Sequence, residues 1–368
     1  MGASSEGGTP HAGRYDAIRH AAALAVLFGH SFVLTRGTDP LSAALMPLAG
    51  WGEGVHELAV NVFFALSGYL VTLSLLRRDS VVAFAIARAL RIWPAAILAC
   101  VLTVLAGAAF TTLPVQDYAT AEGTWRFLVR NIVLRKIEYG LPGVFADNPY
   151  PNVVNGSLWS LPYELRFYAF TALIGLAGVF RRRLWFNLLL AASVLDFLVP
   201  VVDVFPAGET TWRLWLHFFG GAALAVNRDV IPLRAGISVA LAGLALGAAV
   251  VARGPVHAAA FAAATVYAVH WIGQGGGSVR GARRADLSYG IYLFAFPVQQ
   301  GLISLAPAGW NGWTLTLASV PFVLALAALS WYAVEHPALA RREDAIALAQ
   351  RALMRLRPRR PAIPPAGR

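Results

Sequence analysis

Long apolar stretches separated by short polar segments dominate the pattern along this 368-residue chain. A helix needs roughly 18–22 apolar residues to cross the hydrocarbon core of a bilayer. Stretches of about this length recur along the whole chain. The pattern predicts an all-α polytopic integral membrane protein with about ten transmembrane helices, at 17–34, 57–76, 92–113, 157–179, 184–202, 211–227, 235–252, 256–274, 286–306 and 313–334.

Three segments fall outside this set. Residues 80–87, SVVAFAIA, are apolar but too short to span, and arginines flank them, so we expect a helix lying in the membrane interface. Residues 1–13 are small and polar without a signal-peptide pattern, and are expected to be disordered. The longest loop, 114–156, has a length typical of functional or disordered loops.

The placement of basic residues predicts the orientation, because cytoplasmic loops are enriched in lysine and arginine. With a cytoplasmic N-terminus, 22 of the 30 basic residues fall on the cytoplasmic side and seven outside. Both termini are then cytoplasmic, with 14–337 as the membrane domain and 338–368 as a basic tail that begins as an amphipathic helix. The loop 114–156 lies outside.

Composition agrees with this class. The chain is 58% hydrophobic and 13% charged, whereas soluble proteins have about 25% charged residues. The net charge of +11 is explained by topology and by attraction to anionic lipid, so nucleic acid is not an expected partner. The single cysteine, Cys100, lies in an apolar run and is interpreted as a small buried hydrophobe. No metal site is expected.

Ionisable side chains inside spans are functional candidates because lipid excludes them. Arg19 and His30 are eleven residues apart, which puts both on one helix face about 16 Å apart along the axis. Glu164 lies at a depth similar to that of His30, so we expect the two side chains to face one chamber. The structural alternatives are snorkelling for Arg19, a satisfied core histidine for His30, and an ion pair between Glu164 and an arginine such as Arg166.

The second span contains the most polar interior stretch, NVFFALSGYL, residues 61–70. Asn61, Ser67 and Tyr69 are candidates for substrate contacts. Gly68 permits close helix approach, and the alternative for the Ser-Gly pair is helix packing.

Arginines gather just before the third span. Arg88 and Arg91 lie on one helix face at i and i+3, and guanidinium forks suit phosphate. The alternative is an anchoring role at the cytoplasmic interface. Glu335, at the inner edge of the last span, is expected to pair with an inner arginine.

Six stretches, in chain order, resemble the acyltransferase 3 family of integral-membrane acyltransferases. They cover nearly the whole chain, and Arg19 and His30 fall on the Arg-x10-His pair of the family's opening. One departure is Ala295, where the family often has a histidine, so another group is expected to serve there. The matching stretches are RYDAIRHAAALAVLFGH, VNVFFALSGYLVT, RALRIWP, NGSLWSLPYELRFY, SYGIYLF and VEHP.

The resemblance implies transfer of an acyl group, commonly acetyl from acetyl-CoA, to a hydroxyl of a carbohydrate or glycosylated acceptor. It implies an inner or plasma membrane location, with acyl-CoA as a donor substrate and no permanently bound cofactor. The fused extracellular hydrolase-like domain of some members is not expected here.

These expectations combine into one site. His30 is the expected general base, and Glu164 orients it or holds the acceptor. Asn61 or Ser67 stabilises the developing oxyanion. The remaining candidates are Arg19, Arg88 and Arg91 for the phosphates of acyl-CoA, and Tyr69, Trp159 and Ser160 for substrate binding.

A rival function is a membrane transporter or exporter of a glycan or small metabolite, because the same polar residues could line a path. The sequence shows no internal repeat of the kind that many transporters have.

Overall fold

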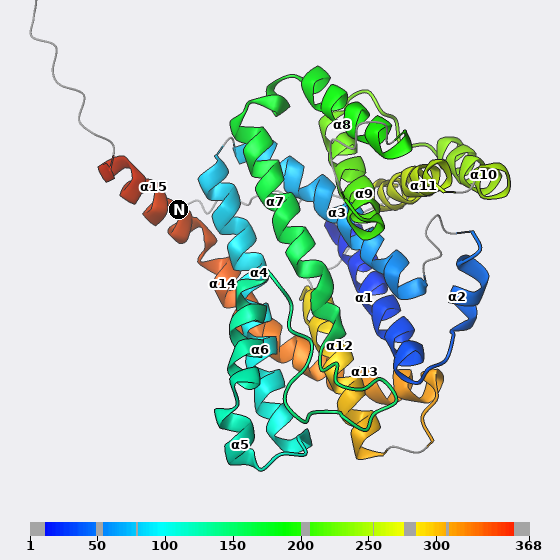
Figure 1. The fold of residues 1–368 in the computed structure, drawn as a ribbon. Coiled ribbons are helices and arrows are strands. Elements are labelled where there is room, and N and C mark those ends of the chain that lie inside the picture. Colours follow the sequence, from blue (N-terminus) through cyan, green and yellow to red (C-terminus); the bar gives the residue numbers. More distant parts are fainter. Residues whose placement is uncertain are drawn as a thin grey trace, which may run out of the picture.

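The computed structural model describes residues 12–48, 54–78, 80–199, 207–252, 254–275, 285–306 and 309–356, which are mostly helical and contain no β-strand. Figure 1 shows the helices as one bundle, with α15 extending from it. The longer helices are α1 (Ala12–Leu34), α3 (Val55–Arg78), α4 (Val81–Phe110), α6 (Glu122–Val133), α7 (Leu161–Leu176), α8 (Arg183–Leu198), α9 (Glu209–Val226), α10 (Ala235–Val251), α11 (Pro255–Gln274), α12 (Ser288–Leu305), α13 (Gly312–Ser330) and α15 (Arg342–Leu356). The short ones are α2 (Pro40–Leu45), α5 (Val115–Thr120), α14 (His336–Ala340), the 3₁₀ turns Gly156–Ser160 and Val179–Arg181, and a π-helical turn at Trp331–Glu335.

A helix lies at every one of the expected membrane segments, which confirms the all-α architecture. Within the described residues, five helical stretches are long and apolar enough to cross a membrane. The other expected spans form shorter or less apolar helices, so the number of about ten crossings stays a prediction. The five stretches are 13–34, 55–77, 81–110, 255–274 and 312–340.

The expectation of a separate interfacial helix at 80–87 is wrong. These residues form the first turns of α4, a continuous helix of 30 residues. Ser80 caps it, because its side chain accepts a hydrogen bond from the Ala83 amide. Arg88 and Arg91 therefore stand on the same helix as the apolar stretch that follows them.

Helices α3 and α9 are in close contact. A Cβ on Gly68 would lie 1.8 Å from the Phe218 carbonyl oxygen, and one on Gly221 would lie 2.1 Å from the Ala65 carbonyl oxygen. Only glycine lets the two backbones come this close. The packing role considered for Gly68 is confirmed.

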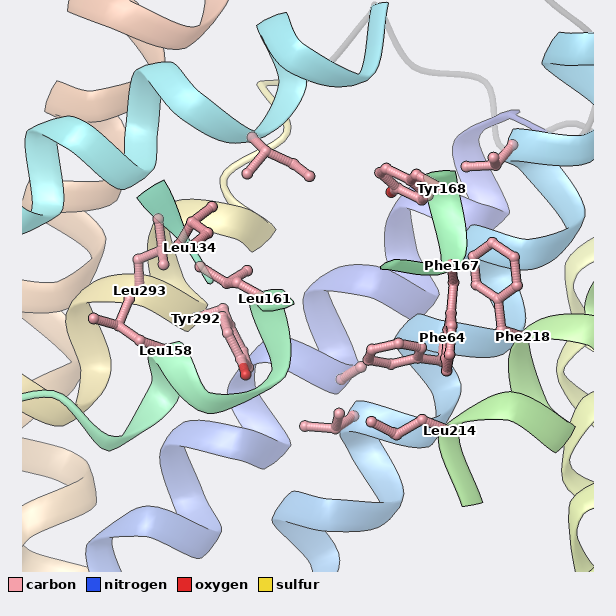
Figure 2. Packing of buried hydrophobic residues seen from close by; sticks show 14 of the residues in the cluster. Phe64, Leu134, Leu158, Leu161, Phe167, Tyr168, Leu214, Phe218, Tyr292 and Leu293 are labelled. Atoms are coloured by element: carbon pink, nitrogen blue, oxygen red, sulfur yellow. The ribbon is translucent and has the colours of Figure 1, made fainter. Parts of the chain in front are cut away.

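Aromatic side chains fill the space around this contact. Figure 2 shows Phe64, Phe167 and Phe218 from α3, α7 and α9 grouped together. The Phe167 ring centroid lies 5.7 Å from that of Phe64 and 5.4 Å from that of Phe218. These edge and tilted contacts hold α7 against the α3–α9 pair.

The long loop 114–156 is folded rather than disordered. It contains α5 and α6, and its last part is hydrogen-bonded to α12. The Gln300 amide donates to the carbonyls of Tyr150 and Val153, each at 2.7 Å, and Asn148 donates to the Gln300 side chain at 2.8 Å. Because Gln300 is fully buried, these bonds satisfy a polar group that would otherwise be costly there.

The two ends of the chain are described only in part. The tail begins as a helix, α15, as expected, while residues 357–368 lie outside the described residues. Of the segment 1–13, only residues 12 and 13 are described, and they belong to α1. Cys100 is buried and free, as interpreted from its apolar surroundings.

Candidate active site

A cavity lies between α1, α3, α4, α7 and α12, and its wall carries most of the expected site residues. Along α3 the lining extends from Val60 to Val71, which corresponds to about 16 Å of helix rise. The cavity is therefore elongated along the bundle. The expected site residues that line it are Arg19, Ser67, Arg88, Arg91, Ser160 and Glu164.

Glu164 is held on this wall by two hydroxyl groups. Tyr168, one turn further along α7, donates a hydrogen bond to Glu164 Oε1. Ser67 Oγ lies 2.9 Å from Tyr168 Oη and 3.4 Å from Glu164 Oε1. Arg166 points elsewhere, is exposed, and lies 5.3 Å from the Tyr163 ring. The alternative of a Glu164–Arg166 ion pair is not what the structure shows.

Ser160 belongs to a second hydroxyl pair, which it forms with Tyr292 of α12. Its Oγ lies 2.6 Å from Tyr292 Oη, and Tyr292 donates to the Ser157 carbonyl at 2.7 Å. The 3₁₀ turn that precedes α7 brings Ser160 to this position. The cavity is thus lined by a carboxylate–hydroxyl group on α7 and by a hydroxyl pair that joins the start of α7 to α12.

Arg19, Arg88 and Arg91 form one end of the cavity, which we name the arginine end. Arg91 pairs with Asp286 at 2.8 Å and with Glu335 at 3.6 Å. Arg19 approaches the same Asp286 at 3.5 Å. The expected pairing of Glu335 with an inner arginine is confirmed. Arg19 is partly buried and also pairs with Asp16 at 2.9 Å, and the snorkelling alternative for it stays a prediction.

Arg88 differs from its two neighbours. Its guanidinium lies 5.8 Å from the Tyr168 ring, and its buried Nε has no hydrogen-bond partner. Among the described residues no carboxylate lies within ion-pair distance of it. Arg88 therefore lines the cavity and keeps a guanidinium donor that no described group occupies.

His30 does not line this cavity. Its ring centroid lies 5.2 Å from that of Phe296 and 5.5 Å from that of His56. Phe296 follows the wall residue Tyr292 by one turn of α12, and His56 precedes the wall residue Val60 by one turn of α3. His30 therefore contacts residues that lie one helical turn beyond the cavity lining on both α3 and α12. We name the pair His30 and His56 the histidine end.

The expected pairing of Glu164 with His30 is not found among the described residues. Glu164 bonds to Tyr168 and Ser67, and the buried Nδ1 of His30 has no partner. Glu164 therefore does not orient His30 in this structure. His30 is not a satisfied core histidine either, because its buried Nδ1 lacks a hydrogen-bond partner. Leaving a buried imidazole nitrogen without a partner is costly.

Three other expected residues lie off the cavity wall. Tyr69 accepts a hydrogen bond from Gln274 at 2.8 Å and packs between α3 and α11. Trp159 faces α9, where the Arg213 guanidinium lies 5.6 Å from its ring. Asn61 is fully buried on α3. Their substrate-binding roles stay predictions.

The structure adds residues that were missed in the sequence. Tyr168 is four residues after Glu164, a spacing that places both on one face of a helix and could have identified it. Asp286 lies just before α12, where nothing in the sequence indicates that it bridges Arg19 and Arg91. His56 was missed because it precedes the expected span by one residue.

Comparison with known proteins adds independent information. The model of the acyltransferase 3 family, described as an acyltransferase domain, matches residues 13–332. Nodulation protein 10 of Rhizobium leguminosarum bv. viciae is 30% identical, over 94% of this chain and 98% of that protein. The O-acetyl transferase of Shigella phage Sf6 is 29% identical, over 91% and 98%. No solved structure matches the chain.

Proposed function

Because this chain belongs to the acyltransferase 3 family, we propose that it moves an acyl group from acyl-CoA to a hydroxyl of a carbohydrate or glycosylated acceptor. Family membership makes the chain an acyltransferase, so the rival function of transporter or exporter is set aside. The name of the phage relative, O-acetyl transferase, supports oxygen as the acceptor atom and acetyl as the transferred group.

The proposed setting is an inner or plasma membrane, crossed about ten times, with both termini cytoplasmic. The distribution of basic residues supports this orientation. The helix that carries Arg88 and Arg91, α4, also contacts α15, the start of the basic tail. A donor made in the cytoplasm would thus approach the arginine end, and an extracytoplasmic acceptor would approach the histidine end.

The single observation that carries the proposal is the polarity of the cavity. Guanidinium groups stand at one end, and the other end stops one helical turn short of a buried imidazole with a free nitrogen. A CoA thioester has matching polarity, with phosphates at one end and the reactive carbonyl at the other. Arg88 is the proposed first phosphate contact, because carboxylates already engage Arg19 and Arg91.

The proposed reaction balances without a resident cofactor. His30 accepts the proton of the acceptor hydroxyl as its oxygen attacks the thioester carbonyl. The new C–O bond forms, the C–S bond breaks, and the CoA thiolate leaves with a proton from His30. Ser160 is the proposed donor to the developing oxyanion, because its hydroxyl can exchange its bond to Tyr292 Oη for one to the oxyanion.

Glu164 receives a different role from the one expected from sequence. Its carboxylate faces the middle of the cavity beside Ser67 and Tyr168. The pantetheine arm of CoA carries amide N–H groups, which can donate hydrogen bonds to a carboxylate. We assign Glu164 to holding this arm between the two ends.

Membranes containing the chain, supplied with labelled acetyl-CoA and a panel of methyl hexopyranosides, test the proposal. Label is expected in an alkali-labile ester on the acceptor, and not in membranes that lack the chain. Acceptor that enters vesicles without label would indicate transport instead. Label that appears on an amine, or on no acceptor of the panel or of the surface glycans, would contradict the proposal.

A further inference from the structure

The histidine end contains a second imidazole that the sequence did not single out. His56, in the first turn of α3, lies with its ring 5.5 Å from that of His30 at an angle of 50°. Like His30, it has a buried Nδ1 without a hydrogen-bond partner. Two buried polar nitrogens without hydrogen-bond partners in one place are unfavourable. They indicate a place where polar groups of a ligand bind.

The local backbone brings the two rings together. A Cβ on Gly29 would lie 2.7 Å from the Cβ of His56, so the residue before His30 must be small for α3 to approach α1. The start of α3 is fixed by α2. Ser42 Oγ accepts a hydrogen bond from the Val55 amide at 2.8 Å and donates to Asp39. The position of His56 is thus set from both sides.

The surroundings of His56 contain charged side chains. Glu57, Asp39 and Arg213 are its charged neighbours. Arg213 pairs with Glu57 at 3.6 Å and lies over the Trp159 ring. His56 itself is half-buried, whereas His30 is 6% exposed. A hydroxyl-bearing ligand that reaches His30 from this end therefore meets His56 as well.

We propose that His56 binds the acceptor. Its imidazole forms a hydrogen bond to a second hydroxyl of the acceptor, next to the hydroxyl that receives the acyl group. This inference rests on the proposed function. Each imidazole nitrogen binds one hydroxyl, so the pair selects an acceptor with two hydroxyls close together over one with an isolated hydroxyl. His56 is then a specificity-determining residue, and it supplies a second imidazole in a chain that has Ala295 on α12.

The test compares methyl hexopyranosides with their monodeoxy derivatives. The wild type is expected to lose at least ten-fold in kcat/KM when the hydroxyl next to the acylated one is removed. Polar sites reject analogues that lack the matching group, because the buried polar atom is left unpaired. His56→Phe keeps a ring of similar size without the nitrogens. It is expected to lower kcat/KM for the parent sugar to the deoxy level and to abolish the discrimination.

Two further variants define the cause. His56→Gln keeps a polar group and is expected to restore part of the discrimination. His257→Phe is the matched control, because the His257 imidazole is hydrogen-bonded to the Leu48 carbonyl. This variant should leave the discrimination unchanged. The KM for acyl-CoA should stay within two-fold in all three variants.

The outcomes separate the two proposals. A wild type that acylates the parent and the deoxy sugar equally well would overturn the role of His56, and so would a His56→Phe variant that still discriminates. Equal losses for donor and acceptor would reduce His56 to a packing residue and overturn the role too. A wild type that transfers no acyl group to any acceptor would instead contradict the proposed function.

Discussion

The two ends of the cavity are built differently. At the arginine end, Arg91 and Arg19 share Asp286, and Glu335 joins them. At the histidine end, His30 and His56 each have a buried nitrogen without a partner. The carboxylates at the arginine end hold helices together by pairing with Arg19 and Arg91. Buried polar atoms without a partner, on Arg88 and on the two histidines, are retained where a ligand supplies the partner. The comparison teaches that charge alone does not identify the reacting end of the cavity.

The largest expected effect concerns the histidine end. His30→Ala should lower the acyl transfer rate by about 10²–10⁴-fold, the range typical of losing a general base. The melting temperature in detergent should change little, because His30 makes no hydrogen bond that the fold depends on. The loss of transfer activity is measured from initial rates with labelled donor, per mole of folded protein.

His257→Ala is the control for this variant. The two histidines are matched in exposure, at 5% and 6%, but His257 is bonded to the Leu48 carbonyl. Its rate should remain close to that of the wild type. Near-normal transfer by His30→Ala would remove the distinction between the two ends.

The next largest effect is a loss of protein stability when the ion pairs of the arginine end are broken. Asp286→Ala leaves Arg91 and Arg19 without their shared carboxylate, and should lower the free energy of unfolding by about 3 kcal/mol. Thermal unfolding in detergent, followed by tryptophan fluorescence, measures the loss. Asp229→Ala breaks an exposed pair with Arg183 and should change stability by less than about 0.5 kcal/mol. Equal losses from both variants would contradict a structural role for Asp286.

The smallest effect concerns the wall between the two ends. Tyr168→Phe removes the hydrogen bond to Glu164 and should lower kcat/KM by about five-fold, close to 1 kcal/mol. Combined with Glu164→Gln it should add almost nothing, because the two side chains act as one unit. Tyr118→Phe, which loses a bond to the Val104 carbonyl outside the cavity, should leave kcat/KM unchanged. Additive losses would show that Tyr168 does not act through Glu164.

The fold could be predicted from hydropathy to a large extent, because lipid requires long apolar helices and allows few alternatives. The prediction was wrong at 80–87, because this apolar run is too short to span a membrane and was therefore interpreted as a separate helix. These residues instead form the first turns of α4. Hydropathy also does not give the number of crossings, since several helices are short or moderately apolar.

The site could be predicted only in part. The position of each residue within its own span gave the depths of His30 and Glu164. It did not give the directions in which α1 and α7 face. Those directions depend on packing, such as the approach of α3 and α9 at Gly68. The partners Asp286 and His56 lie at helix starts, where sequence boundaries are uncertain by a few residues.

The central claim is that the arginine end anchors the donor while the histidine end performs the reaction. Calorimetric titration of a non-hydrolysable thioether analogue of acetyl-CoA into the wild type, Arg88→Gln and His30→Ala tests it most directly. Arg88→Gln should weaken the Kd by at least about ten-fold, the value of one charge-assisted hydrogen bond, while His30→Ala should leave it within two-fold. An unchanged Kd in Arg88→Gln, or an equal weakening in His30→Ala, would contradict this division of the cavity.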